Sequence, residues 1–207
     1  MTPIVTIYVG DDRVQYRAYE DQLCKLPFFR AALHGEFKEA VDKTINMPED
    51  DPEAVAVLLE WLAVGTYTFD GNRLQKSTMA AREMSETTTS DTLLRALFDL
   101  EVCVVASKYD AQDLVTKAKE NFYKSQTGFK AIDILRLWRA YSTTGLDGFP
   151  FPEKSSFKAR EIVRSLARDH RAELVSAVVK SPLLGLLFLE ACAAEDPMET
   201  SRKKRRH

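Results

Sequence analysis

The sequence has few of the residues from which disulfide frameworks and metal centres are built. Its three cysteines, Cys24, Cys103 and Cys192, are widely spaced and odd in number, and no CxxC pair occurs. This pattern favours neither a disulfide framework nor a zinc site, and it is typical of a reducing compartment. The three histidines are isolated, and none lies at ligand spacing from a cysteine or an aspartate. We therefore expect no metal site and no cofactor, and we expect Cys24 and Cys103 to be small buried apolar side chains.

Motifs of the common enzyme classes are also missing. The sequence has no phosphate-binding loop, dinucleotide fingerprint, nucleophile elbow or HExxH pair. Glu49, Asp50 and Asp51 are neighbouring acids, but they directly precede Pro52. At such a position carboxylates meet the free amide groups of a helix start, so we expect Asp50 or Asp51 to cap a helix. The sequence therefore predicts no catalytic residue, no small-molecule substrate and no enzyme activity.

Long apolar runs are absent as well. The longest, Leu183 to Leu189, is far shorter than the ~20 residues that a membrane-spanning helix needs. The N-terminus, Met1 to Val5, lacks the basic and apolar regions of a signal peptide. We therefore expect an intracellular protein, nuclear or cytoplasmic, that is neither secreted nor bound to a membrane.

Positive charge gathers at the C-terminal end. The basic run consists of Arg202, Lys203, Lys204, Arg205 and Arg206. Because the formal net charge is −2, these five residues leave −7 on the remainder of the chain. An acidic body does not favour binding to a specific nucleic acid. The run itself is a candidate nuclear localisation signal, and the alternative is a solubilising disordered end.

Periodicity in the first 65 residues predicts two strands followed by helices. Val5, Ile7 and Val9 alternate with polar residues, and a turn signal at 10–12 leads to a second alternating segment from Val14, so we expect a hairpin. A helix should begin near residue 21 or 22. Pro27 can open a second short helix that Gly35 ends. Residues 44–47 read as a strand, and the capped helix follows them.

The rest of the chain predicts helices. Residues 70–91 are polar and rich in serine and threonine, which is typical of a long loop. Apolar residues then recur at helical spacing over 93–104 and 112–123, and again from residue 129 onward. We expect an α+β domain over 1–125, with the polar loop 70–91 inside it. An all-helical extension over 126–196 and a basic disordered tail over 197–207 follow.

The first 124 residues resemble the BTB/POZ domain, in the style of small fungal-type BTB proteins. The resemblance rests on four segments taken in order. They are Ile7-Tyr8-Val9-Gly10 with Val14; Asp21-Gln22-Leu23-Cys24 with Pro27-Phe28-Phe29; Glu36-Phe37-Lys38-Glu39-Ala40 with Met47-Pro48-Glu49-Asp50-Asp51-Pro52 and Glu60-Trp61-Leu62; and Ala106-Ser107-Lys108-Tyr109-Asp110 with Leu114. It implies a helical cluster flanked by a small β-sheet, a role in protein–protein interaction, and self-association as a homodimer.

Two positions bear on which branch of the family is implied. Dimeric transcriptional members place an acid in the first strand and a basic residue before the first helix, and these form a charged pocket. Ile4 and Glu20 stand there in this chain, so the same pair is not expected. Members that recruit a cullin scaffold carry a hydrophobic-x-Glu triplet after the second short helix, and Phe37, Lys38 and Glu39 occupy that place. The alternative is that Phe37 packs on its own domain and Glu39 is merely solvated.

These observations predict a protein–protein interaction module. The first candidate role is an adaptor or scaffold for a cullin-RING ubiquitin ligase, with Phe37, Lys38 and Glu39 in contact with the cullin. The second is a nuclear, transcription-associated regulator that acts through BTB self-association. A third is a BTB-like protein with neither a cullin nor a DNA link.

Overall fold

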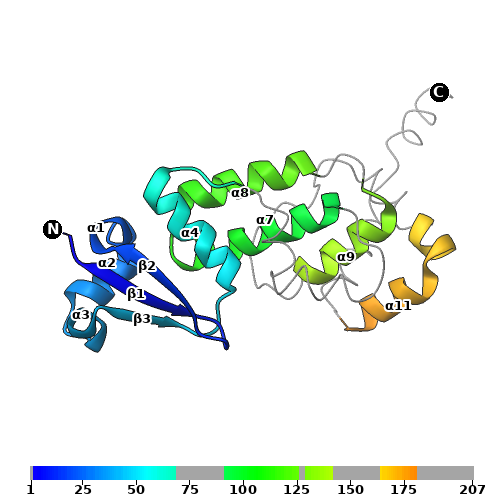
Figure 1. Cartoon of the computed structure of the whole chain (residues 1–207). Coiled ribbons are helices and arrows are strands. Elements are labelled where there is room, and N and C mark those ends of the chain that lie inside the picture. Colours follow the sequence, from blue (N-terminus) through cyan, green and yellow to red (C-terminus); the bar gives the residue numbers. More distant parts are fainter. Residues whose placement is uncertain (1, 69–90, 126–128, 142–163, 181–207) are drawn as a thin grey trace, which may run out of the picture. The chain divides into compact units, whose positions relative to one another are not determined.

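The chain folds as an α+β protein, which confirms the predicted class. The computed structural model describes residues 2–68, 91–125, 129–141 and 164–180 (Figure 1). The chain divides into two compact units, Met1–Gly128 and Phe129–His207. The first unit holds a small three-stranded sheet and several helices, and the described part of the second is helical. In the described residues, no helix combines the length and apolar character required to traverse a bilayer.

Strand β1 (Ile4–Val9) is the middle strand of the sheet. It pairs antiparallel with β2 (Val14–Tyr19) and parallel with β3 (Thr44–Met47), so the strand order is β2-β1-β3. Val5, Ile7 and Val9 are fully buried on one face, as the alternation predicts. A parallel pair needs a crossover connection, and the helices between β2 and β3 provide it (Figure 1).

Three short helices make up this crossover. They are α1 (Glu20–Leu23), α2 (Pro27–His34) and α3 (Lys38–Asp42). Pro27 lies in the first turn of α2 and Gly35 is its C-cap, as expected. Helix α3 was not predicted. It ends at Lys43, which adopts a left-handed conformation with φ of 48°.

Three longer helices complete the first unit: α4 (Pro52–Val64), α7 (Asp91–Lys108) and α8 (Gln112–Ser125). Helix α7 packs against both α4 and α8 (Figure 1). Gly65 ends α4 in the left-handed region, φ 72°, where glycine is favoured. Of the predicted polar loop 70–91, residues 70–90 lie outside the described residues, and Asp91 is already the first residue of α7.

The prediction that Asp50 or Asp51 caps this helix is confirmed, and the structure shows which of the two does so. Asp51 is the N-cap, and its side chain accepts a hydrogen bond from the Ala54 amide at 2.9 Å. Asp50 is buried, and its carboxylate instead accepts bonds from Lys108 Nζ at 2.9 and 3.0 Å and from the Tyr109 hydroxyl at 2.7 Å. Asp50 thus joins the turn before α4 to the end of α7.

The second unit contains α9 (Ala131–Tyr141), a helical stretch at 164–169, and α11 (Arg171–Lys180). Leu135, Leu166 and Ala177 form its small buried cluster. Helical spacing predicted these elements. The C-terminal tail expected at 197–207 lies outside the described residues.

Candidate functional site

The triplet singled out by the sequence lies at the start of α3. Phe37 is the N-cap residue and is 61% exposed. Lys38 is exposed and forms an ion pair with Asp42 at 3.6 Å, and Glu39 lies half-buried in the first helical turn. Phe37, Lys38, Glu39 and the exposed Val41 are called the α3 surface below. An exposed aromatic side chain beside a carboxylate suits contact with a partner protein.

Backbone packing fixes the position of the Phe37 ring. A Cβ atom on Gly35 would lie 2.8 Å from this ring and 2.6 Å from the Ala31 carbonyl oxygen. The ring therefore rests on the glycine, where any larger residue would displace it. One side of Phe37 is supported by its own domain, while most of the residue faces solvent. Packing on its own domain and contact with a partner are therefore compatible.

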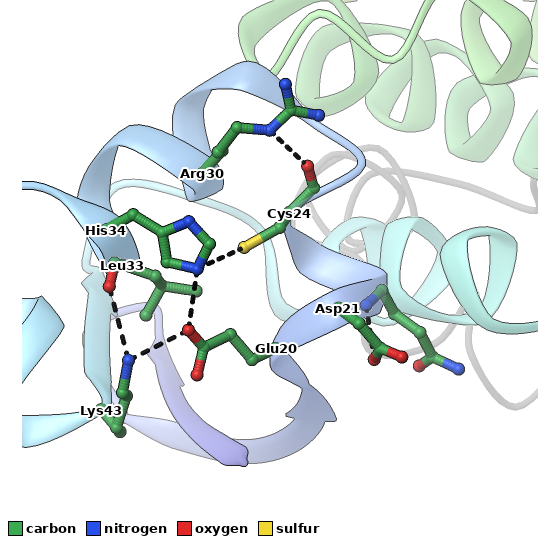
Figure 2. Close-up of polar contacts among 8 residues, drawn as sticks. Glu20, Asp21, Cys24, Arg30, Leu33, His34 and Lys43 are labelled. Carbon is green, nitrogen blue, oxygen red and sulfur yellow. Dashed lines mark hydrogen bonds and ion pairs between the residues drawn. The ribbon is translucent and has the colours of Figure 1, made fainter. Parts of the chain in front are cut away.

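A second group of polar side chains gathers where α1 begins and α2 ends. Figure 2 shows Glu20, Cys24 and His34 pointing toward one another, with Lys43 reaching the same carboxylate. Glu20 Oε1 lies 3.0 Å from both Lys43 Nζ and His34 Nε2. The Glu20 side chain is only 10% exposed, and Oε2 has no hydrogen-bond partner among the described residues. The hydrogen bond from Lys43 is the main cause that lowers the pKa of Glu20.

Cys24 belongs to this group, contrary to expectation. Its Sγ lies 3.8 Å from His34 Nε2, and the residue is half-buried, so the prediction of a buried Cys24 is wrong. The same prediction is correct for Cys103, which is fully buried. Burial, followed by the nearby Glu20 carboxylate, raises the pKa of the Cys24 thiol. The thiol is therefore mainly protonated at neutral pH and is a poor nucleophile.

Helix geometry brings these residues together. Glu20 and Cys24 are four residues apart on one helical turn, and the Cys24 amide donates to the Glu20 carbonyl at 2.9 Å. Arg30 Nε donates to the Cys24 carbonyl at 2.9 Å, which fixes the end of α1 against α2 (Figure 2). His34 is the last residue of α2. The histidine is isolated from cysteine along the sequence but not in space; the i,i+4 spacing of Glu20 and Cys24 was the only local signal.

The group opens onto a surface pocket. The pocket has a volume of about 410 Å³. It is lined by Thr2, Pro3, Glu20, Asp21, Cys24 and His34. Solvent and small ions can therefore reach the cluster from this side.

Ile4 and Glu20, which stand where dimeric transcriptional BTB members have their charged pocket, take different roles. Glu20 does form a partly buried ion pair, but its partner is Lys43 and not a residue of β1. Ile4 is 54% exposed and lies directly opposite Tyr19 in the β1–β2 ladder, and Tyr19 is 52% exposed. As expected, Ile4 and Glu20 do not pair; the exposed Ile4–Tyr19 pair was not foreseen.

A buried acid lies elsewhere, between the segment after α4 and helices α7 and α8. Asp99 Oδ1 accepts a hydrogen bond from the Tyr67 hydroxyl at 3.1 Å, and Asn121 Nδ2 donates to that hydroxyl oxygen at 2.9 Å. Asp99 Oδ2 has no hydrogen-bond partner in the described part of the chain. Burial raises the pKa of Asp99 to about 7.

The basic run, Arg202, Lys203, Lys204, Arg205 and Arg206, lies outside the described residues.

No protein-family model matches the chain, and no curated protein is significantly similar to it.

Proposed function

We propose that this chain is a protein–protein interaction module with a BTB/POZ-type domain in its first unit, and that the α3 surface binds a partner protein. The observation that carries the proposal is the exposure of Phe37 on a rigid support beside Lys38 and Glu39. Interface hot spots are commonly aromatic side chains surrounded by polar residues. Because most of Phe37 faces solvent, its aromatic surface is available to a partner.

The arrangement of the first unit supports a BTB/POZ-type domain. A hairpin leads into short helices, a third strand returns parallel to the first, and helices α4, α7 and α8 follow. Asp50 connects two of the segments on which the resemblance rests, since it binds Lys108 and Tyr109. Tyr109 in turn stacks on Phe29 with ring centroids 5.3 Å apart. These contacts give a physical reason for the segments to occur together.

The partner that we propose is a cullin scaffold, which would make the chain an adaptor of a cullin-RING ubiquitin ligase. Binding of the purified full chain to a purified cullin fragment can be measured by titration calorimetry. Truncating a hot spot costs about 2 kcal/mol or more, so Phe37→Ala/Glu39→Ala should weaken binding roughly 30-fold. Val64→Ala is the matched control, because this valine is 65% exposed but lies on α4.

The outcomes separate the parts of the proposal. A wild-type chain that does not bind the cullin fragment excludes the adaptor role and leaves an interaction module with another partner. A wild type and a double variant that bind equally well show that the α3 surface is not the contact.

A self-associating nuclear regulator is a second candidate, and the exposed Ile4–Tyr19 pair favours it. Tyr19 lies on the edge strand β2 and Ile4 lies opposite it on β1, and exposed side chains beside a sheet edge are a common place for chains to associate. Analytical ultracentrifugation should then show a dimer that Tyr19→Ser dissociates. A monomer at all concentrations contradicts this role.

Deleting residues 202–206 from a fluorescent fusion tests nuclear entry separately.

A further inference from the structure

Glu20, Cys24 and His34 offer one carboxylate, one thiol and one imidazole at a single point. Their ligand atoms all lie within 4.8 Å of one another. The distance from Cys24 Sγ to His34 Nε2 is 3.8 Å, and that from His34 Nε2 to Glu20 Oε1 is 3.0 Å. In tetrahedral zinc sites with bonds of about 2.0–2.3 Å, neighbouring ligand atoms are roughly 3.4–3.6 Å apart. Small side-chain rotations would therefore place all three atoms around one ion.

The second, independent observation is the unpaired carboxylate oxygen. Glu20 Oε2 is buried and has no hydrogen-bond partner in the described residues, while Oε1 is shared by Lys43 and His34. A buried polar atom without a partner is costly and uncommon in folded proteins. A cation that is held by both oxygens of the carboxylate would satisfy Oε2 as well as Oε1.

The surroundings suit a cation despite the nearby ammonium group. Lys43 donates to Glu20 and to the Leu33 carbonyl, which holds the carboxylate in place; ligating carboxylates are commonly fixed by such hydrogen bonds. His34 is the last residue of α2, and the negative end of a helix dipole favours positive charge. On binding, the thiol would lose its proton to solvent, so that carboxylate and thiolate balance the two charges of the ion.

We propose that Glu20, Cys24 and His34 bind a divalent transition-metal ion of the zinc class. Sulfur and imidazole ligands select zinc and similar ions over calcium and magnesium, which prefer oxygen. His34 would bind through Nε2 in its neutral form, with the ring hydrogen on Nδ1. Three protein ligands leave a fourth position that faces the pocket, open to water or to an atom of another molecule.

The test uses the purified full chain after treatment with a chelator. Zinc affinity is measured by competition with a coloured chelator, and cobalt(II) is added separately to record its absorption spectrum. One ion should bind per chain, and cobalt should give a thiolate charge-transfer band. Cys24→Ser should remove this band, and both Cys24→Ser and His34→Gln should weaken zinc binding more than about 100-fold. Losing a partner that merely orients a ligand costs 10–100-fold.

Two control variants should bind as the wild type does. Asp21→Asn alters an acid that lines the same pocket but donates no atom to the cluster. Cys103→Ala removes a thiol elsewhere in the unit. Because the His34 side chain is 58% exposed, His34→Gln should fold normally, and circular dichroism verifies this. A wild type without saturable zinc binding overturns the proposal. So does zinc binding that persists within threefold in both Cys24→Ser and His34→Gln, or a cobalt band lost in Cys103→Ala.

Discussion

Removing the Asp50 carboxylate should destabilise the first unit, because this group joins elements far apart in sequence. Asp50 follows β3, whereas Lys108 ends α7 and Tyr109 follows it. The Asp50 side chain is almost fully buried, and Tyr109 packs against Phe28 and Phe29 of α2. The carboxylate therefore links the turn before α4, the end of α7 and, through the tyrosine ring, helix α2.

The expected magnitude follows from how each partner is exposed. A hydrogen bond to a charged acceptor contributes about 1.5–3 kcal/mol, and the buried Tyr109 hydroxyl should contribute this amount. The Lys108 side chain is 44% exposed, so solvent can replace the carboxylate and its ion pair contributes at most about 1 kcal/mol. Asp50→Ala should thus lower the free energy of unfolding by roughly 2–4 kcal/mol. Tyr109→Phe should cost about 1.5–3 kcal/mol, largely through the same bond.

Unfolding in urea is monitored by hydrogen exchange in peptides from residues 2–68 and 91–125. These peptides report on the first unit without signal from the second. In a double-mutant cycle, Asp50→Ala and Tyr109→Phe should show a coupling energy of about 1.5–3 kcal/mol. Asp51→Ala is the matched control: it removes a helix cap at a cost of about 1 kcal/mol and should not couple to Tyr109. Additive effects of the Asp50 and Tyr109 changes, within 0.5 kcal/mol, would refute the reasoning.

Two further changes test the buried acid and the support of the α3 surface. Burial raises the pKa of Asp99 from 3.8 to about 7. In the folded chain Asp99 therefore keeps its proton up to a higher pH than in the unfolded chain. The free energy of unfolding should fall as the pH rises from 3.8 to 7. At 1.36 kcal/mol per pKa unit, the loss in the free energy of unfolding is on the order of 4 kcal/mol. Asp99→Asn should therefore be more stable than the wild type at pH 8, and its stability should depend less on pH. Urea unfolding at pH 4–8 measures both profiles, and equal slopes would contradict this prediction. Gly35→Ala should displace the Phe37 ring and lower the free energy of unfolding by about 1–3 kcal/mol. It should also weaken partner binding, as Phe37→Ala does. If a calorimetric titration of Gly35→Ala gives the wild-type affinity, the position of the ring is unimportant.

The sequence predicted elements whose signals are local. Proline at the first position of α2, glycine at its end, and the acid before α4 each act within one helical turn, and alternation in β1 acts within one strand. Contacts between distant residues could not be predicted in the same way. Asp50 and Tyr109 are 59 residues apart, and an acid before a proline reads as a cap whether or not a tyrosine reaches it. The Glu20 cluster depends on how α1 packs against α2, for which the sequence has no periodic signal.

Helix α3 ends at a lysine in the left-handed conformation, an end that the sequence does not signal. Contacts of Lys43 with other elements nonetheless define the position of α3. Lysine rarely adopts the left-handed conformation, which costs of order 1–3 kcal/mol and persists only where surrounding contacts hold it. Here its carbonyl accepts a bond from the Thr6 amide at 2.9 Å, and its ammonium binds Glu20 and the Leu33 carbonyl. These contacts offset the strain and tie the end of α3 to β1, α1 and α2.

The same contacts connect the two proposals. The carboxylate that receives Lys43 also faces Cys24 and His34, so an ion bound by Glu20 would act on the residue that ends α3. The α3 surface begins with Phe37, only one short helix away from Lys43. Partner affinity should therefore be measured on both metal-free and zinc-loaded protein. An affinity that differs between the two forms, with Cys24→Ser abolishing the difference, shows that the cluster and the α3 surface are coupled, whereas equal affinities contradict the coupling.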